Sequence, residues 1–339
     1  MGLSLRLPRA QNNIVVIGGG TGSFTVLSGL KKYARNITAL VNMVDDGGST
    51  GILRDELGAL PPGDVRQCLA ALSNSPKVRE LFGYRFSGGS LDGHPFGNLF
   101  LSALEQMTGS FAEAVQTASE ILNITGRVVP ITLEDIHLQL TTPQGRVIKG
   151  QRLIADSELL GASAQPKLKI VPNAAINPEA KEAIMQAELI VIAPGDMYSS
   201  LAPTLMVRGV AQALSQSAAK VAYVVNLVTK HGETTGFNAN DYIHELERLA
   251  GIKFIEYVIF NEKPPAVDLL RRYAKDDEFP VEIDTPALEK EGRKVLYADL
   301  LAKGAWVGAQ SSDPLAAKRS YIRHDSDKIA KELMAVLRI

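Results

Sequence analysis

The stretch NNIVVIGGGTGSFTVLSGL, residues 12–30, decides the fold. Its apolar run Ile14–Ile17 predicts a buried strand, the glycines predict a tight turn, and residues 23–34 predict a helix. Dinucleotide-binding domains open in this way, with the spacing G-x-G-x-x-G. Here the glycines fall two apart, and Ser23 stands where the third fingerprint glycine belongs. The turn therefore indicates a phosphate loop of another kind.

The glycine turn offers groups that suit a phosphate. Glycines let the backbone approach a ligand closely, and the next helix points its free N–H groups and positive dipole end at that ligand. Hydroxyl side chains add further donors. The alternative is a tight turn that binds nothing. The candidate phosphate-binding residues are Gly18, Gly19, Gly20, Thr21, Gly22 and Ser23.

Apolar runs alternate with amphipathic stretches along the rest of the chain. The expected buried strands are 14–17, 37–44, 189–193, 221–227 and 254–260. The expected helices are 23–34, 65–72, 98–107, 111–122, 178–187, 202–214, 239–249 and 265–273. This alternation predicts an α/β fold, a Rossmann-like, three-layer, doubly wound and mostly parallel sheet.

Two segments add to that plan. DIHLQLTTPQGRVIKGQ alternates in polarity around a Pro-Gln-Gly turn, which predicts an antiparallel hairpin inserted at about residues 134–152. HDSDKIAKELMAVL predicts a final helix at about residues 325–338, capped by Asp325 or Ser326, and Asn177 is expected to cap another helix. No linker or repeat is visible, so residues 1–339 are expected to form a single compact domain.

Composition excludes several classes of protein. The 36 basic and 37 acidic residues give a net charge of −1, which argues against nucleic-acid binding through bulk positive charge. One cysteine among 339 residues excludes an internal disulfide framework. No apolar run approaches the roughly 20 residues of a membrane span, and the first residues make a poor signal peptide. A cytoplasmic protein is expected.

The second glycine-rich segment is VDDGGSTGILRDE, residues 44–56. Asp45 and Asp46 follow a strand, where an acidic residue of a Rossmann domain accepts from ribose hydroxyls. They could instead hold a divalent metal such as Mg²⁺ together with phosphate oxygens, or form a solvated acidic turn. A flexible loop containing Gly47 and Ser49 is expected to follow.

Two further loops carry catalytic candidates. In LPPGDVRQ, Asp64 is placed as the N-cap of a helix, or as a base or a substrate contact. In GGSLDGHPFGN, His94 and Asn98 stand at the start of a helix. His94 is either a structural hydrogen-bonding group or a site residue.

The last two loops again follow strands. APGDMYSS contributes Gly195, Ser199 and Ser200, and NLVTKHGETTG contributes Asn226 and Thr229. Ligands of open α/β sheets bind outside the carboxyl ends of the strands, so these loops are expected to converge on one cleft. His94, His231 and Glu233 lack the spacing of a metal site. A Walker A motif and a G-x-S-x-G elbow are also missing.

The assembled loops resemble the CofD/YvcK-like family. The resemblance rests on GGGTG at 18–22, VDDGGSTGILRDELGALPPGDVRQCLAAL at 44–72, GHPFGNLFL at 93–101, APGDMYSSLAPTL at 193–205 and NLVTKHGETTGF at 226–237. One branch of the family is the 2-phospho-L-lactate transferase, which uses a nucleotide-activated donor, a deazaflavin acceptor and magnesium. The other is the gluconeogenesis factor, which the long DDGGSTG run and the GETTG loop favour.

The resemblance implies a nucleotide ligand and a homodimer. In the gluconeogenesis factor branch the ligand is a nucleotide sugar of the UDP-N-acetylglucosamine type, with effects on carbon use and cell shape. In the transferase branch, a residue at the place of Asp64 helps to hold the acceptor. The gluconeogenesis factor branch usually has Ser-Leu-Tyr after Pro-Gly, where this chain has Asp196-Met197-Tyr198. That carboxylate disfavours a nearby phosphate unless a metal or a basic group intervenes.

Three hypotheses follow. The first is a regulator that binds a nucleotide sugar or a nucleoside diphosphate. The second is a transferase of the 2-phospho-L-lactate type. The third is a nicotinamide-dependent oxidoreductase with His94 as proton donor, which the broken fingerprint disfavours even though the loop offers a generic diphosphate site for NAD.

Overall fold

A computed structural model describes residues 10–157, 165–303 and 321–339. Its main sheet has seven parallel strands in the order β10-β9-β8-β7-β1-β2-β3. The strands are β1 (Ile14–Gly18), β2 (Ile37–Val41), β3 (Arg127–Pro130), β7 (Leu189–Ile192), β8 (Lys220–Val224), β9 (Tyr257–Asn261) and β10 (Lys294–Ala298). All five predicted strands are found at these places, which confirms the α/β prediction.

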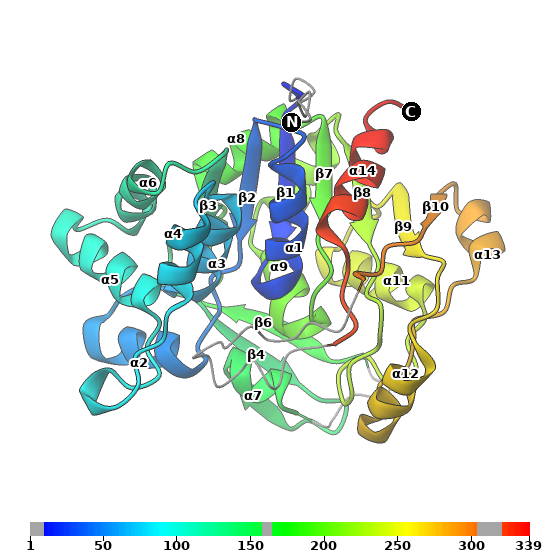
Figure 1. Ribbon diagram of the computed structural model, residues 1–339. Helices are drawn as coiled ribbons and strands as arrows, with labels where there is room; N and C mark the ends of the chain where they lie inside the picture. Colours follow the sequence, from blue (N-terminus) through cyan, green and yellow to red (C-terminus); the bar gives the residue numbers. More distant parts are fainter. Residues whose placement is uncertain (1–9, 158–164, 304–320) are drawn as a thin grey trace.

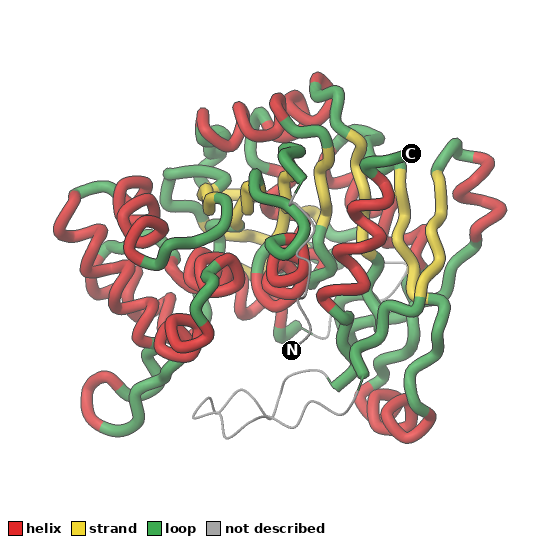
Figure 2. Tube along the Cα trace, turned by 45° about the horizontal axis from the view of Figure 1, so that its top comes forward, coloured by secondary structure: helices red, strands yellow, loops and turns green. Residues whose placement is uncertain are grey.

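Helices cover both faces of this sheet (Figures 1 and 2). On one face α1 packs against α3 and α14, and α5 and α6 extend this layer past β3. On the other face α8, α9, α10 and α11 pack on one another. Strands β1, β2, β7 and β8 are covered on both sides and apolar, as parallel strands require. The result is the predicted three-layer architecture.

The helix bounds follow chain order. They are α1 (Gly20–Leu30), α2 (Gly48–Leu57), α3 (Pro62–Leu72), α4 (Pro76–Gly83), α5 (Phe96–Thr108), α6 (Phe111–Ile121), α7 (Gln151–Ala155), α8 (Pro178–Gln186), α9 (Ala202–Met206), α10 (Val210–Gln216), α11 (Ala239–Ala250), α12 (Val267–Tyr273), α13 (Thr285–Lys290) and α14 (Ser326–Val336). Short 3-10 turns span Gly89–Leu91 and Ala274–Asp276, and a π-helical turn spans Met197–Leu201. Asn177 and Asp325 cap α8 and α14 as predicted.

Two predictions of local structure, one of a helix and one of a loop, are wrong. The expected helix over residues 202–214 is two helices, α9 and α10, because the chain turns at Gly209 (φ +100°) and Arg208 bridges to Ala175. The expected flexible loop after Asp46 is mostly the helix α2. Glycine and serine lower helix propensity, but Asp45 supports the first turn by accepting from Gly47 N and Thr50 Oγ1.

The predicted antiparallel hairpin is confirmed and belongs to a small second sheet. β4 (His137–Thr141) pairs with β5 (Val147–Lys149) on one side and with β6 (Lys167–Val171) on the other. Figure 1 shows β4, β6 and α7 beyond the ends of the main strands. Arg54 of α2 ties this region down, because it donates to the Asp45 and Ile136 carbonyls and pairs with Asp135.

Candidate functional site

The crevice of this fold lies between β1 and β7. From β1 the chain proceeds outward to β2 and β3, whereas β7 is followed on its other side by β8, β9 and β10. The loops after β1 and β7 therefore diverge, and such a switch point is where open α/β sheets bind ligands. A Cβ atom built on Gly22 would lie 1.7 Å from the Pro194 carbonyl oxygen, so the two loops touch there. Only glycine fits at this contact.

The start of α1 faces open space in this crevice. Gly19 is the N-cap residue and supplies no side chain to the helix start. Gly20 has φ +61°, and a Cβ atom built on it meets nothing within 4 Å. The helix N-terminus thus combines an exposed first turn with the positive end of the helix dipole, which is the arrangement that binds anions. Ser23, by contrast, is buried and 2% exposed.

Asp64 reaches this N-terminus from α3. Its Oδ1 accepts a hydrogen bond of 3.0 Å from Gly20 N, and a Cβ atom on Gly19 would lie 2.1 Å from its Oδ2. Burial, followed by the charge of Asp45, raises the pKa of Asp64 to about 7. The predicted N-cap role is wrong, because α3 begins at Pro62 and Asp64 lies inside its first turn. A carboxylate therefore occupies a donor of the glycine turn.

The side chains of Asp45 and Asp46 form hydrogen bonds with different elements. Asp45 is bonded to the start of α2, and burial raises its pKa despite the bonds from Gly47 N and Thr50 Oγ1. Asp46 accepts from Gln151 N and Arg152 N, so it caps α7 of the small second sheet. Asp45 thus lies beside Asp64, whereas both oxygens of Asp46 hold another element.

The loop after β7 is fixed by two side chains from the loop after β8. Asn226 accepts from Gly195 N at 3.1 Å and donates to Gly195 O at 2.9 Å. Glu233 Oε1 accepts from Tyr198 N and Ser199 N, which stabilises the start of the π-helical turn. Burial and then Asp196 raise the pKa of Glu233 to about 7. These bonds join two loops that both flank the crevice.

Lys230 lies beside Asp196 and offsets the negative charge of its carboxylate. Its Nζ forms an ion pair with Asp196 Oδ2 and lies 3.8 Å from Glu233 Oε2. Burial lowers the pKa of Lys230, but Asp196 and Glu233 raise it above its usual value, so the amine is charged. Of the two alternatives expected beside Asp196, a metal or a basic group, the structure thus shows a basic group.

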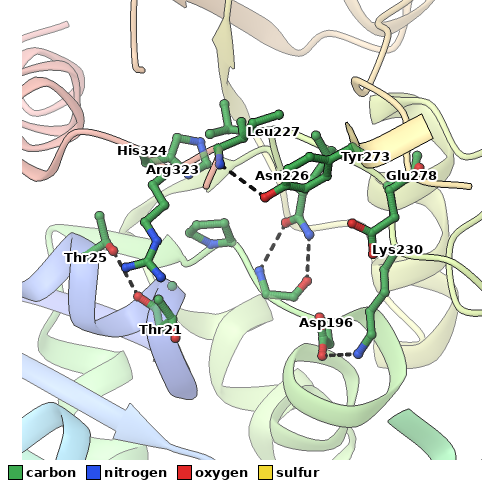
Figure 3. A pocket seen from close by; sticks show the side chains of 16 residues that line it. Thr21, Thr25, Asp196, Asn226, Leu227, Lys230, Tyr273, Glu278, Arg323 and His324 are labelled. Carbon is green, nitrogen blue, oxygen red and sulfur yellow. Dashed lines mark hydrogen bonds and ion pairs between the residues drawn. The ribbon is translucent and has the colours of Figure 1, made fainter. Parts of the chain in front are cut away.

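A cavity of about 250 Å³ joins these parts (Figure 3). Its walls come from the first turns of α1, the loops after β7 and β8, and the segment before α14. Two cations, Lys230 and Arg323, and the hydroxyls of Thr21 and Thr25 line it. Asp196, Tyr273 and Glu278 also line it, and Tyr273 Oη accepts from Tyr321 N and Ile322 N. This cavity is our candidate binding site.

Sequence reasoning missed part of this site. Lys230 lies within the segment NLVTKHGETTG, but its side chain was not named as a candidate from the sequence. Arg323, Tyr273 and Glu278 come from segments without a glycine turn after a strand. The sequence offers no signal for them beyond an Arg-His pair before the cap of α14. Of the predicted residues, Thr21, Gly22, Gly195, Asn226 and Thr229 line the cavity.

A second polar cluster lies around the start of α2. Ser49 Oγ lies 2.8 Å from His94 Nδ1 and accepts from Asn98 Nδ2 at 3.1 Å. Arg66 Nε in turn donates to Asn98 Oδ1 at 2.8 Å. His94 and Asn98 are buried, at 7% and 2% exposure. The predicted residues Ser49, His94 and Asn98 thus contact one another and join α2 to α5 without lining the cavity.

The donors for a metal ion are few. Within the described ranges, no group of three or more His, Cys, Asp or Glu side chains could hold a metal. Asp45 and Asp64 are the neighbouring carboxylates, and Asp46 is bonded elsewhere. Mg²⁺ takes one or two carboxylates together with phosphate oxygens and water. The protein alone does not make a complete site, so magnesium stays a prediction.

Known proteins are similar to this chain in sequence and in fold. The family pattern of the 2-phospho-L-lactate transferase CofD matches residues 14–301. A candidate gluconeogenesis factor of Thermoanaerobacterium thermosulfurigenes is 42% identical over 96% of each chain. The gluconeogenesis factor of Listeria innocua is 37% identical over 96% of this chain and 95% of its own. A crystal structure of a Bacillus halodurans protein has a TM-score of 0.86 at 33% identity, covering 96% of this chain and all of that one.

Fold and crevice define an α/β protein of the doubly wound class, with a cavity at the switch point of its sheet, where proteins of this class bind ligands. The chain belongs to the CofD family, and its relatives include gluconeogenesis factors. This confirms the family resemblance. In the parts that the structure describes, no helix is long and apolar enough to cross a membrane.

Proposed function

We propose that the protein is a regulator of the gluconeogenesis factor type that binds a nucleotide sugar of the UDP-N-acetylglucosamine class. One observation carries the proposal: the open N-terminus of α1, Lys230 and Arg323 belong to one cavity at the switch point. Two cations and a helix N-terminus suit a diphosphate. Binding would connect the protein to carbon use and cell shape.

The binding mode that we propose begins with the diphosphate. It lies between the first turn of α1 and the two cations, with the hydroxyl of Thr21 as a further donor, whereas the Thr25 hydroxyl donates to Thr21 O. Asp64 holds Gly20 N until the ligand arrives, so the phosphate uses the remaining donors of the turn or displaces that carboxylate. Ser200, close to Gly19, is available to the sugar end.

Isothermal titration calorimetry tests this proposal. UDP-N-acetylglucosamine is titrated into the full chain, with GDP and NAD as competitors of the same cavity. We expect heat and a single site, with NAD weaker because Ser23 replaces the fingerprint glycine. No heat at millimolar ligand would rule the proposal out. Light scattering on the same samples measures whether the protein is the homodimer that we expect.

A transferase of the 2-phospho-L-lactate type is our second candidate. It is favoured by the half-buried Asp64–Asp45 pair, because carboxyl groups with raised pKa values concentrate at catalytic sites. Asp64 would orient an acceptor hydroxyl and take its proton. The test is a magnesium-dependent product in a mixture of nucleotide-activated phospholactate and deazaflavin. Loss of turnover in Asp64→Asn with donor binding retained assigns the acceptor role, and absence of product with wild type rejects this candidate.

A further inference from the structure

A second cavity lies next to the candidate binding site. The glycine turn does not line this cavity, so phosphate binding at that turn gives it no role. Its volume is about 320 Å³, and it lies at the carboxyl ends of β8 and β9. The two cavities share Asn226 and Leu227, so this short stretch separates one from the other. A ligand that crosses Asn226 and Leu227 reaches both.

The chemistry of the second cavity differs from that of the first. Its walls are mainly apolar, with the Phe260 ring, Ile283 and prolines at 264, 265 and 280. Polar groups such as Asn261 and Glu282 stand among them. A space of this kind suits a flat aromatic group with polar edges, because its faces are apolar and its edge needs hydrogen-bond partners.

The walls of this cavity are held in place by bonds within the protein. Val281 N donates to Leu227 O at 3.2 Å, which joins one wall to the shared stretch. Leu300 N donates to Asn261 Oδ1 at 3.0 Å, which fixes the end of β9. The Phe260 ring makes an edge-to-face contact with Tyr297 at 5.8 Å between centroids. A preformed wall costs little ordering on binding.

We infer that this second cavity is the nucleobase subsite of the candidate binding site. The inference rests on the proposed function, since it assigns a place to one half of the nucleotide. The diphosphate takes the first cavity, the ribose crosses Asn226 and Leu227, and the base lies against Phe260. Base recognition then depends on groups far from the glycine turn in sequence.

Calorimetry with two probes tests the inference. UDP-N-acetylglucosamine reports on both cavities, and inorganic pyrophosphate, which has no base, reports on the first cavity alone. The variants are Phe260→Leu, which removes the ring, and Ile283→Trp, which fills the cavity from its half-buried rim. Phe86→Leu is the matched control, because Phe86 is also half-buried and also makes an edge-to-face contact with a tyrosine, Tyr84.

We expect Phe260→Leu and Ile283→Trp to lower the affinity for UDP-N-acetylglucosamine by about tenfold, which is within the range that base stacking supplies. Pyrophosphate affinity stays within about twofold of wild type, and Phe86→Leu changes neither. Wild-type affinity for UDP-N-acetylglucosamine in both variants overturns the inference and leaves the proposed function intact. An equal loss of affinity for UDP-N-acetylglucosamine and for pyrophosphate in these variants also overturns the inference.

A further arm separates the two proposals. If wild type binds GDP or UDP but not the nucleotide sugar, the sugar assignment fails and the variants are measured with that nucleotide instead. If wild type binds no nucleotide at millimolar concentration, both proposals fail together. Circular dichroism and thermal unfolding confirm that each variant is folded before titration.

Discussion

Asp64 Oδ1 accepts a hydrogen bond of 3.0 Å from the backbone N–H of Gly20, and this contact links the helix α3 to the N-terminus of α1. A carboxylate therefore occupies a position that an anionic ligand would use. Burial and the neighbouring Asp45 raise its pKa to about 7, so near neutral pH the group is partly protonated. The relationship makes both stability and binding depend on the charge at Asp64.

The first prediction concerns stability. The raised pKa of Asp64 in the folded state means that its contribution is favourable at low pH and is lost as the pH rises toward 7. Asp64→Asn keeps an oxygen for Gly20 N and removes the charge. It should raise the free energy of unfolding at both pH values, and by about 2–3 kcal/mol more at pH 8 than at pH 5. Urea unfolding at both values checks this, and an equal change of stability at both would contradict it.

The second prediction compares two glycines of the turn. Gly22→Ala places a methyl group on the Pro194 carbonyl oxygen, so the loops after β1 and β7 must separate. We expect a loss of about 3 kcal/mol or more, as for other severe steric changes in a core. Gly20→Ala meets open space and has only its positive φ to overcome, which costs about 1–2 kcal/mol. Similar urea midpoints for the two variants would show that the contact with Pro194 is wrong.

The third prediction concerns the cation beside Asp196. Lys230→Met removes one of the two cations of the cavity and should lower the affinity for UDP-N-acetylglucosamine by about tenfold or more. Asp196→Asn is the control, because it keeps Lys230 and removes the competing carboxylate, so affinity should stay equal or rise. Calorimetry at low and high salt measures both. Unchanged affinity in Lys230→Met would exclude Lys230 from the site.

The fourth prediction concerns the small second sheet. Arg54 is buried and holds the Asp45 and Ile136 carbonyls together. Arg54→Met leaves these acceptors without their donor and should cost about 2–3 kcal/mol of stability. Hydrogen exchange should rise first in β4, β5 and β6. Arg152→Met, on the exposed side of α7, is the control and should change exchange little, since its ion pair with Asp156 is exposed. Uniform loss of protection across the main sheet would contradict a local role.

The sequence predicted the fold well where the signal is local. Continuous apolar runs identify β1, β2, β7, β8 and β9, because strands buried on both faces carry few polar residues. The edge strands β3 and β10 were missed. β10 has the sequence Lys-Val-Leu-Tyr-Ala and is half-exposed. β3 is short and begins with an exposed arginine. Their pairing partners, not their own residues, make them strands.

The site was predicted in part for a similar reason. The glycine turn and the loops after β7 and β8 are marked by composition, and they do meet at one cavity. The tasks of single side chains are not marked. Asp46 caps a helix more than 100 residues away, and Arg323 arrives from the other end of the chain. Such partners are set by tertiary packing, which the local pattern does not contain.

A crystal structure of the protein grown with millimolar UDP-N-acetylglucosamine tests the central claim most directly. The account predicts density for the diphosphate between the first turn of α1 and the side chains of Lys230 and Arg323, in the cavity at the switch point. Density for the nucleotide at another surface, with this cavity holding solvent alone, would contradict it.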